Sequence, residues 1–251
     1  MSKEILIKKI IKPFNKTIEI EGDKSLSIRW ALLASQGIGK STSMNLLKSQ
    51  DVLSTLNCLK KLGVKVHMNK KKCEILGMGI NGYNYKKNIV LNAGNSGTLA
   101  RLIMGLLIHS KNKIKINGDK SLSNRDFLRV SRPLERFGAK IKTNLGKLPF
   151  TIEGTENPKP IKYNEDRGSA QCKSAIMLAA LNTEGQTIIK AKKSRDHTEI
   201  LFKDLGIPIK ITKKINYDFI TIRGKNKISK LDYRIPSDIS SSAFFIVLTA
   251  L

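Results

Sequence analysis

The sequence predicts an α/β fold made of three similar units, and recurring landmarks of two kinds carry this prediction. Segments rich in Ser and Gly precede strongly apolar stretches at residues 96–98, 169–171 and 240–242, with spacings of 73 (169 − 96) and 71 (240 − 169) residues. Helix starts containing Asp recur at residues 49–51, 124–126 and 194–196, and each of these helices is expected to end at a glycine: Gly63, Gly138 and Gly206. A unit of about seventy residues therefore contains one apolar and one amphipathic helix.

Short stretches between these landmarks predict the strands. Apolar or β-branched residues alternate with polar ones, or cluster, at residues 64–66, 113–116, 140–142, 187–189 and 219–222. The expected order in each unit is β-α-β-α-β-β. Because the first helix of each unit is apolar nearly all round, we expect three such helices to pack together inside a ring of the other elements.

The composition is that of a globular protein with a high positive charge. The chain has 251 residues, 40% of them apolar, and a formal net charge of +26. Clustered cations favour nucleic acids, but here the lysines are scattered through every segment and only 10 of the 46 basic residues are Arg. Aromatic residues for base stacking are also few, with five Tyr and one Trp. We therefore expect small acidic substrates, and a basic nucleic-acid-binding module is the alternative from another class of function.

No metal site, leader or membrane anchor is predicted. Cys58, Cys73, Cys172 and the three histidines lack the spacing of metal ligands, and sparse thiols in odd number are typical of reduced cytosolic proteins. Residues 1–9 mix charges into short apolar runs, unlike a signal peptide. No apolar run approaches the roughly 20 residues that span a bilayer.

One octet of the sequence occurs twice. Gly22–Arg29, with the sequence GDKSLSIR, recurs as Gly118–Arg125, with the sequence GDKSLSNR, 96 residues later (118 − 22). We expect the internal repeat to explain both copies. In the first copy, a helix beginning near Ser27 would direct Lys24, Ser25 and Arg29 toward an anion, together with free backbone N–H groups. An ordinary helix cap with solvated cations is the alternative.

Two further helix starts have the same chemistry. The segment Asn95-Ser-Gly97-Thr, with Arg101 one turn later, and the segment 169–171, with Lys173, each combine a hydroxyl with a cation. Plain caps of buried helices are again the alternative. Around a pseudo-threefold axis the three starts would converge, and neighbouring positive helix ends are better explained by a bound anion than by stability.

The segment Gly37–Thr42 contains residues of a phosphate-binding loop without the full pattern. Ala34 occupies the position of the first required Gly, and an apolar helix rather than a strand precedes the segment. We predict a helix cap and a turn that lead into a strand.

The three units fill residues 23 to 235, and a fourth begins at Pro236 and stops within its apolar helix at Leu251. We expect a truncated chain, because natural ends rarely fall inside an uncapped apolar helix. A dimer or domain swap that covers the last helix is the alternative.

Six ordered motifs span the chain, at residues 22–29, 91–98 with Arg101, 118–125, 169–174, 194–199 and 235–242. In order and spacing they resemble the EPSP synthase (3-phosphoshikimate 1-carboxyvinyltransferase) family, over about the first three-fifths of a typical member. The resemblance implies an inside-out α/β barrel fold, with two domains of three units each and ligands in the cleft between them. Residues 22–235 would form one domain, and residues 1–21 and 236–251 would belong to the other.

The resemblance also implies an activity. The family moves the enolpyruvyl group of phosphoenolpyruvate to the 5-hydroxyl of shikimate 3-phosphate, on the pathway to chorismate and aromatic amino acids, without a metal or organic cofactor. Lys24 would be catalytic and touch both substrates. The resemblance places Ser25, Arg29, Ser169, Ala170, Gln171, Ser194 and Arg195 at shikimate 3-phosphate, and Asn95, Gly97, Arg125 and Gln171 at phosphoenolpyruvate. In the second octet, Lys120 and Ser121 would then belong to a capped, solvated turn.

The sequence departs from many family members at two positions. Ala170 replaces a second Ser and His197 replaces a Tyr, and both changes are typical of another branch of the family. Gly97 implies that a complete version is sensitive to the inhibitor glyphosate. The family's catalytic Asp, its Lys and Glu pair and its later Arg residues would lie beyond Leu251, so we expect this chain to bind substrates without turnover.

A UDP-N-acetylglucosamine enolpyruvyl transferase is the alternative within the fold. That enzyme has a Lys-Asn start and a reactive loop Cys, whereas residues 24–29 have the sequence KSLSIR. We expect the complete protein to be a cytoplasmic monomer that binds the two small substrates, with no nucleic acid or membrane partner.

Overall fold

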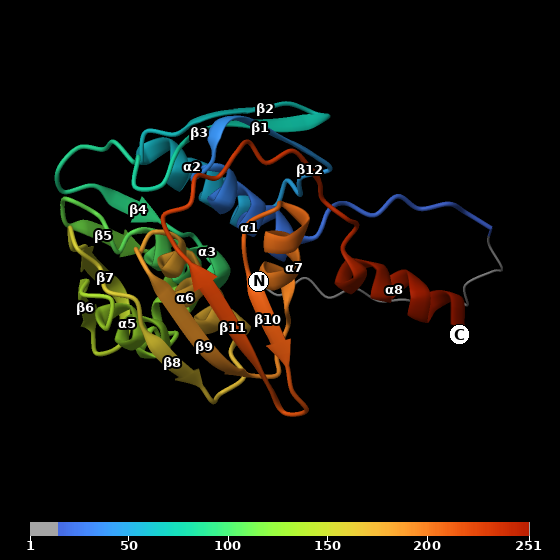
Figure 1. The fold of residues 1–251 in the computed structure, drawn as a ribbon. Helices are drawn as coiled ribbons and strands as arrows, with labels where there is room; N and C mark the ends of the chain where they lie inside the picture. The colour runs from blue at the N-terminus through green and yellow to red at the C-terminus, as the bar shows by residue number, and fades with distance from the viewer. Residues whose placement is uncertain (1–14, 251) are drawn as a thin grey trace.

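The computed structural model describes residues 15–250 and contains the predicted units in order (Figure 1). The first unit comprises α1 (Lys24–Ala34), β1 (Ile38–Met44), α2 (Gln50–Lys61), β2 (Lys65–Met68) and β3 (Lys72–Met78). The second comprises β4 (Val90–Asn92), α3 (Gly97–Leu106), β5 (Ile114–Asn117), α4 (Lys120–Ser123), α5 (Leu128–Glu135), β6 (Lys140–Asn144) and β7 (Lys147–Glu153). The third comprises β8 (Lys162–Glu165), α6 (Ala170–Leu181), β9 (Gln186–Lys192), α7 (His197–Asp204), β10 (Lys210–Lys213) and β11 (Tyr217–Arg223), and β12 (Tyr233–Arg234) and α8 (Ile239–Ala250) follow.

Each unit contributes a four-stranded sheet, and the three sheets have the same topology. Their strand orders are β12-β1-β3-β2, β4-β5-β7-β6 and β8-β9-β11-β10. In every sheet the first pair is parallel and the other two pairs are antiparallel. The predicted α/β class and its repeated unit are confirmed. The three sheets remain separate and surround the helices without joining into one closed barrel.

The first strand in the sheet of the first unit is β12, which follows the third unit in the sequence. β12 pairs in parallel with β1, with Ser43 opposite Tyr233, and so occupies the place that β4 and β8 have in their sheets. Trp30 Nε1 in α1 donates to the carbonyl oxygen of Leu231 at 2.8 Å, which ties the same segment to the core. The chain therefore leaves this body beside its entry point, where Gly22 bridges Ser237 and the Asp23 N–H donates to Pro236 O at 2.8 Å.

The three apolar helices α1, α3 and α6 fill the centre, as predicted (Figure 1). Their buried residues run through 26–34 in α1, 99–106 in α3 and 172–181 in α6. The backbones of α3 and α6 approach so closely that a Cβ on Gly105 would overlap the carbonyl oxygen of Ala175. Each fully buried Leu or Ile contributes roughly 1.5–3 kcal/mol by leaving water. This packing sets the relative positions of the helix starts.

The outer helices α2, α5 and α7 end as predicted. Gly63, Gly138 and Gly206 follow them with φ values of 90°, 107° and 66°, a region that glycine adopts at little cost. Two starts differ from the prediction. α1 begins at Lys24 rather than near Ser27, because Asp23 is its N-cap, and α5 begins at Leu128, where Asp126 Oδ1 accepts from the backbone N–H at 2.8 Å.

The two octets occupy places that are not equivalent. Gly22–Arg29 begins the central helix α1, whereas Gly118–Arg125 lies between β5 and α5 and forms the four-residue helix α4. In the third unit the corresponding place is the segment between β9 and α7. The expectation that the internal repeat explains both copies is therefore wrong.

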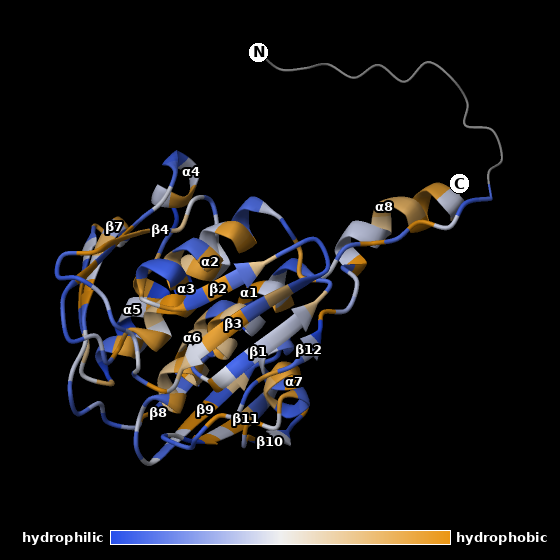
Figure 2. Ribbon diagram, turned by 90° about the horizontal axis from the view of Figure 1, so that it is seen from above, coloured by the Kyte–Doolittle hydropathy of each residue, from blue (hydrophilic) through white to orange (hydrophobic). Residues whose placement is uncertain are grey.

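The last helix differs most from the three central helices in its surroundings. α8 is as apolar as a central helix, but none of its described residues is buried, and Phe244 is 80% exposed. Figure 2 shows this helix projecting from the body of the protein with its apolar residues uncovered. No layer of the described chain packs around α8, in contrast to α1, α3 and α6. Residues 1–14 of the predicted 1–21 segment, and Leu251, lie outside the described residues.

The segment Gly37–Thr42 enters β1 at Ile38, as the strand prediction requires, and so is not a strand-to-helix loop of the phosphate-binding type. Within residues 15–250, no helix combines the length and the apolar character needed to cross a membrane.

Candidate anion-binding site

The starts of α1, α3, α6 and α7 are joined by side-chain hydrogen bonds. Arg29 in α1 donates to Ser174 in α6 and to Thr198 in α7. Gln171 in the first turn of α6 donates to Thr98 in α3 at 3.1 Å. The four starts therefore lie close together, and α6 is hydrogen-bonded to both α1 and α3. Residues predicted at the site fall into two clusters, one around the start of α1 and one around the start of α3.

The first cluster surrounds the start of α1. Lys24, Ser25 and Arg195 line a cavity of about 550 Å³ together with His197 and the beginning of α8. The Lys24 side chain is half exposed, and its Nζ lies 3.2 Å from Asp51 Oδ2. Such an exposed ion pair is worth only about 0.2–1 kcal/mol, so Lys24 can leave Asp51 for a stronger anion in the cavity.

Arg29 contacts the cavity-lining residue Ser25 and is 5% exposed. Its Nε donates to Thr198 Oγ1 at 2.8 Å, and one terminal nitrogen donates to the Ser25 carbonyl at 3.1 Å. Burial lowers the pKa of Arg29 to about 10, against the opposing influence of the Glu199 carboxylate. The guanidinium therefore keeps its positive charge at neutral pH.

The second cluster surrounds the start of α3. Arg101 is 4% exposed and donates to Gln171 Oε1 at 2.8 Å, and its guanidinium lies 5.0 Å from the centre of the Phe127 ring. Because Gln171 also donates to Thr98, the orientation of its amide is fixed. Burial, reinforced by Arg129 and Arg125, lowers the pKa of Arg101 to about 10.

Gly97 lies between two of these cations. A Cβ at this position would be 2.9 Å from a terminal nitrogen of Arg101 and 3.1 Å from one of Arg125. The absence of a side chain thus lets both guanidinium groups approach the helix start. Asn95 lies nearby and donates to Asp119 Oδ2 at 2.5 Å, which turns its amide toward the second octet.

The start of α6 contributes backbone groups and few free side chains. Ser169 is the N-cap and accepts from the Cys172 N–H at 3.2 Å, and Ala170 is the first residue of the helix. The Ser194 hydroxyl, just before α7, is buried without a hydrogen-bond partner in the described part of the chain. The Ser169 hydroxyl is therefore engaged in capping α6.

Lys173 does not behave as predicted. The sequence suggested a cation at the cleft, but the side chain is 2% exposed and its Nζ lies 2.5 Å from Glu199 Oε1. The reason is its place on α6, where every later residue of the helix is buried. A buried cation needs a partner, and Glu199 supplies it.

Sequence reasoning also missed the residues that hold the predicted ones. Thr98, Ser174, Thr198 and Glu199 contact Gln171, Arg29 or Lys173 but received no role from the sequence. One signal was present, because Lys173 is the only charged residue in α6. A single charge in a helix that is buried on all sides requires an acidic partner on a neighbouring element.

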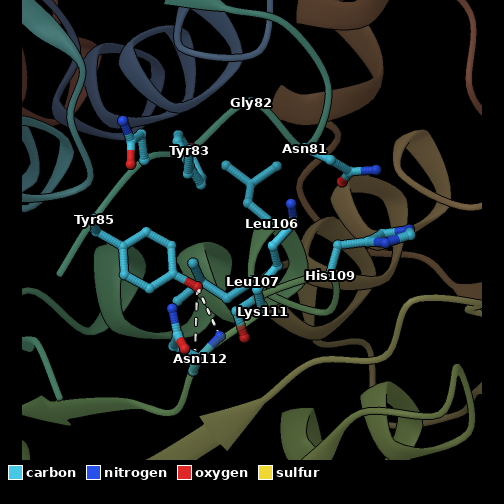
Figure 3. Close-up of a pocket in the computed structure, with 11 residues that line it drawn as sticks. Asn81, Gly82, Tyr83, Tyr85, Leu106, Leu107, His109, Lys111 and Asn112 are labelled. Carbon is cyan, nitrogen blue, oxygen red and sulfur yellow. Dashed lines mark hydrogen bonds between the residues drawn. The ribbon is translucent and has the colours of Figure 1, made fainter. Parts of the chain in front are cut away.

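A separate cavity of about 320 Å³ lies at the other end of α3 (Figure 3). Tyr83, Tyr85, Leu106, His109 and Asn112 line it, and the Tyr85 hydroxyl lies 3.4 Å from the backbone nitrogen of Asn112. None of the predicted site residues lines this cavity. This cavity is therefore separate from the candidate site at the helix starts.

Comparison with known proteins gives one family. The family model described as EPSP synthase (3-phosphoshikimate 1-carboxyvinyltransferase) matches residues 8–251. Relatives named 3-phosphoshikimate 1-carboxyvinyltransferase from Vesicomyosocius okutanii and Caldicellulosiruptor saccharolyticus are 42% and 39% identical to the chain over 247 and 241 residues. The matches cover 96% and 93% of this chain and 55% and 54% of the relatives.

A solved structure agrees with these relatives. The EPSP synthase from Acinetobacter baumannii matches with a TM-score of 0.83 and 35% identity, over 92% of this chain and 52% of that one. The chain thus spans about half the length of the curated relatives it matches. Sequence and fold agree over nearly all of its residues, and the chain belongs to the EPSP synthase family.

Proposed function

We propose that this chain holds the two anionic substrates of a 3-phosphoshikimate 1-carboxyvinyltransferase at the starts of α1, α3, α6 and α7. The observation that carries the proposal is a pair of buried guanidinium groups. Arg29 and Arg101 are 5% and 4% exposed, and neither forms an ion pair with a carboxylate within residues 15–250. Buried charges without a counterion are costly, and a bound anion would neutralise them.

The helix starts favour the same ligands. A positive helix end stabilises an anion by roughly 0.3–1 kcal/mol, and by up to about 2 kcal/mol when partly buried. Shikimate 3-phosphate and phosphoenolpyruvate each carry a phosphate and a carboxylate. Two clusters of cations, at the starts of α1 and α3, therefore match two ligands that each carry two or three negative charges.

The proposed roles follow the two clusters. Lys24, Ser25, Arg29, Ser194 and Arg195 would hold shikimate 3-phosphate, with the start of α6 at its phosphate. Asn95, Gly97, Arg125 and Arg101 would hold phosphoenolpyruvate. Gln171 lies between the clusters and would contact both substrates, and Lys24 would reach both after leaving Asp51.

The chemistry is an addition followed by an elimination. The 5-hydroxyl oxygen of shikimate 3-phosphate bonds to C2 of phosphoenolpyruvate, its proton is lost, and C3 gains a proton. Phosphate then leaves C2 while C3 loses a proton, which restores the double bond and gives the enolpyruvyl ether. Cations fixed before the reaction can stabilise the charge that develops on the carboxylate and the leaving phosphate.

The domain division belongs to the proposal. Residues 22–235 would form one domain, and residues 1–21 and 236–251 would belong to a second, with the substrate cleft between them. The adjacent crossing points at Gly22 and Ser237 support this division, as does the uncovered apolar helix α8. We also propose a cytoplasmic monomer, a location supported by the three free, buried cysteines.

Calorimetric titration tests the proposal. Because the chain spans about half of its relatives' length, binding is measured before turnover. Wild-type protein should bind shikimate 3-phosphate, and phosphoenolpyruvate should bind in its presence. Inorganic phosphate serves as the control for simple charge attraction and should bind at least about tenfold more weakly, because it lacks the carboxylate and the ring hydroxyls.

The same preparation decides between the proposal and a nucleic-acid-binding module. Unrelated duplex DNA should bind weakly, with no competition against shikimate 3-phosphate. Tight DNA binding with a steep dependence on salt, together with no response to either substrate, would contradict the proposed function.

A further inference from the structure

The buried ion pair Lys173–Glu199 is not among the substrate contacts proposed above. Both of its residues are adjacent in sequence to residues that contact Arg29. Lys173 belongs to the first turn of α6, and Glu199 belongs to the first turn of α7. Their side chains are 2% and 5% exposed, and Nζ and Oε1 are 2.5 Å apart. The pair therefore joins the starts of two helices at a depth that solvent does not reach.

On each helix, a residue adjacent in sequence to the ion pair contacts Arg29. Ser174 follows Lys173, and Thr198 precedes Glu199. The two hydroxyl oxygens lie 2.6 Å apart, and Arg29 donates from Nε to Thr198 at 2.8 Å and from a terminal nitrogen to Ser174 at 3.3 Å. A shift of α7 relative to α6 would therefore separate the two acceptors of the guanidinium.

The direction of each hydrogen bond can be assigned. The Ser174 hydroxyl donates to the carbonyl oxygen of Ala170 at 2.7 Å, so it accepts from Thr198. Thr198 in turn accepts from Arg29 Nε. The chain of donors runs from Arg29 through Thr198 and Ser174 to the backbone of α6, and it leaves no hydroxyl proton free to rotate.

The remaining N–H groups of Arg29 are those that a ligand could use. A guanidinium has five N–H donors, and three bonds from Arg29 end on Thr198, Ser174 and the Ser25 carbonyl. The two donors left over belong to the two terminal nitrogens. The two terminal nitrogens of an arginine can together bind a carboxylate in a bidentate manner.

We propose that Lys173 and Glu199 are positioning residues, which clamp α6 against α7 so that Thr198 and Ser174 fix the guanidinium of Arg29 for a substrate carboxylate. The identity of that substrate rests on the proposed function. The orientation of Arg29 does not, because the hydrogen bonds that fix it lie within this chain.

The Nε–H resonance of Arg29 in the folded 251-residue chain tests the orientation without any ligand. Arg29→Lys assigns the resonance among the 10 arginines of the sequence. In wild-type protein its exchange with water should be slowed about tenfold or more relative to exposed arginines, because the N–H is buried and hydrogen-bonded. Thr198→Val should remove most of this protection and Thr198→Ser should restore it.

The ion pair is tested by Glu199→Gln and by the charge-free double variant Lys173→Met with Glu199→Leu. Both should speed exchange of the Arg29 Nε–H about tenfold, while the fold is retained. Lys193→Met is the matched control, because it breaks an exposed pair with Asp218 in the same unit, at 2.7 Å, and should leave Arg29 unchanged.

Two results would overturn the proposal. One is a folded ion-pair variant in which the Arg29 Nε–H exchanges as in wild-type protein. The other is that neither ion-pair variant folds, since the pair would then serve the fold and not the orientation. Titration with shikimate 3-phosphate completes the test: Thr198→Val and Glu199→Gln should bind about tenfold more weakly than Lys193→Met. If wild-type protein fails to bind, the proposed function fails, and the exchange measurement still decides the role of the pair.

Discussion

The octets Gly22–Arg29 and Gly118–Arg125 differ at one residue, yet they form different structures. Both begin with the same cap, in which an Asp side chain accepts from a backbone N–H three residues later at 2.7 Å. The first continues as the 11-residue helix α1, and the second ends after the four residues of α4. The local sequence therefore starts a helical turn and does not decide how far it continues.

The residues that follow the shared part make the difference. Ile28 is fully buried and leads into Trp30 and four further buried residues of α1. At the same place in the second octet, the Asn124 amide donates back to the Lys120 carbonyl at 3.0 Å and closes the turn. Asn in this position competes with the helix backbone, whereas burial of apolar surface drives α1 onward.

The cations of the two octets differ in the same way. Arg29 is buried and donates three hydrogen bonds. Arg125 is exposed, and its guanidinium lies near Gly97 in the second cluster. Nearly the same motif thus supplies a buried, hydrogen-bonded cation in one place and an exposed cation in the other.

Exchanging the differing residue should have the largest effect. Ile28→Asn makes the first octet identical to the second, and it places an amide in the core where Ile28 is fully buried. The free energy of unfolding should fall by about 3–5 kcal/mol. The reverse exchange, Asn124→Ile at an exposed position, should change it by less than about 1 kcal/mol. Urea denaturation measures both, and equal costs would show that the two places are equivalent after all.

Replacing Arg29 and Arg125 should affect the binding of different substrates. Arg29→Ala should weaken shikimate 3-phosphate binding about tenfold or more, because a buried charge-assisted contact is lost. Arg125→Ala should leave that affinity nearly unchanged and weaken phosphoenolpyruvate. Calorimetry with phosphoenolpyruvate added to the shikimate 3-phosphate complex tests this division. If both variants lost affinity for both substrates, the two clusters would form a single binding site, which would contradict the proposed division.

Gly97→Ala should have a smaller effect on the second cluster. The added Cβ would press on the flexible ends of Arg101 and Arg125 and not on backbone. The free energy of unfolding should therefore change by less than about 1 kcal/mol, while phosphoenolpyruvate should bind severalfold more weakly. Gly105→Ala is the control in the same helix, because its Cβ would overlap the backbone of α6. It should cost more stability than Gly97→Ala, and the opposite order would contradict the packing described here.

Acid should act at different pH values on His197, which lies in α7 near Arg29, and on Asp119 in the second octet, and these effects should be the smallest. Burial, reinforced by Arg29, lowers the pKa of His197 below its ordinary 6.5, so its stabilising contribution is complete above pH 6.5 and is lost as pH falls through the folded pKa. Hydrogen bonds from the Leu122 N–H and Asn95 lower the pKa of Asp119 below 3.8, so its contribution disappears only in stronger acid.

Unfolding free energies measured between about pH 7.5 and pH 5.5 check the first of these contributions. Stability should fall as the pH is lowered, and His197→Gln should reduce the slope, since the unfolded chain then has one fewer proton to gain. An unchanged slope in His197→Gln would assign the pH dependence to other groups.

The sequence was sufficient for the units, the central helices and the C-terminal glycines of the outer helices, because each rests on a local pattern or on burial along one helix. It was not sufficient for the pairing of β12 with β1, which joins residues about 190 positions apart. The burial of Lys173 in an ion pair could not be predicted for the same reason, since its partner Glu199 lies on another helix. The proposed substrate-binding residues were thus easier to recognise from the sequence than the residues that position their side chains.

Titration of wild-type protein, Lys24→Ala and Lys120→Ala with shikimate 3-phosphate tests the central claim most directly. The two lysines occupy the same position in the two octets, and only Lys24 lines the cavity beside Arg29. Wild-type protein and Lys120→Ala should bind with the same affinity, and Lys24→Ala should bind about tenfold more weakly. Equal losses in the two variants, or no binding to the folded wild-type chain at millimolar ligand, would contradict an anion site at the start of α1.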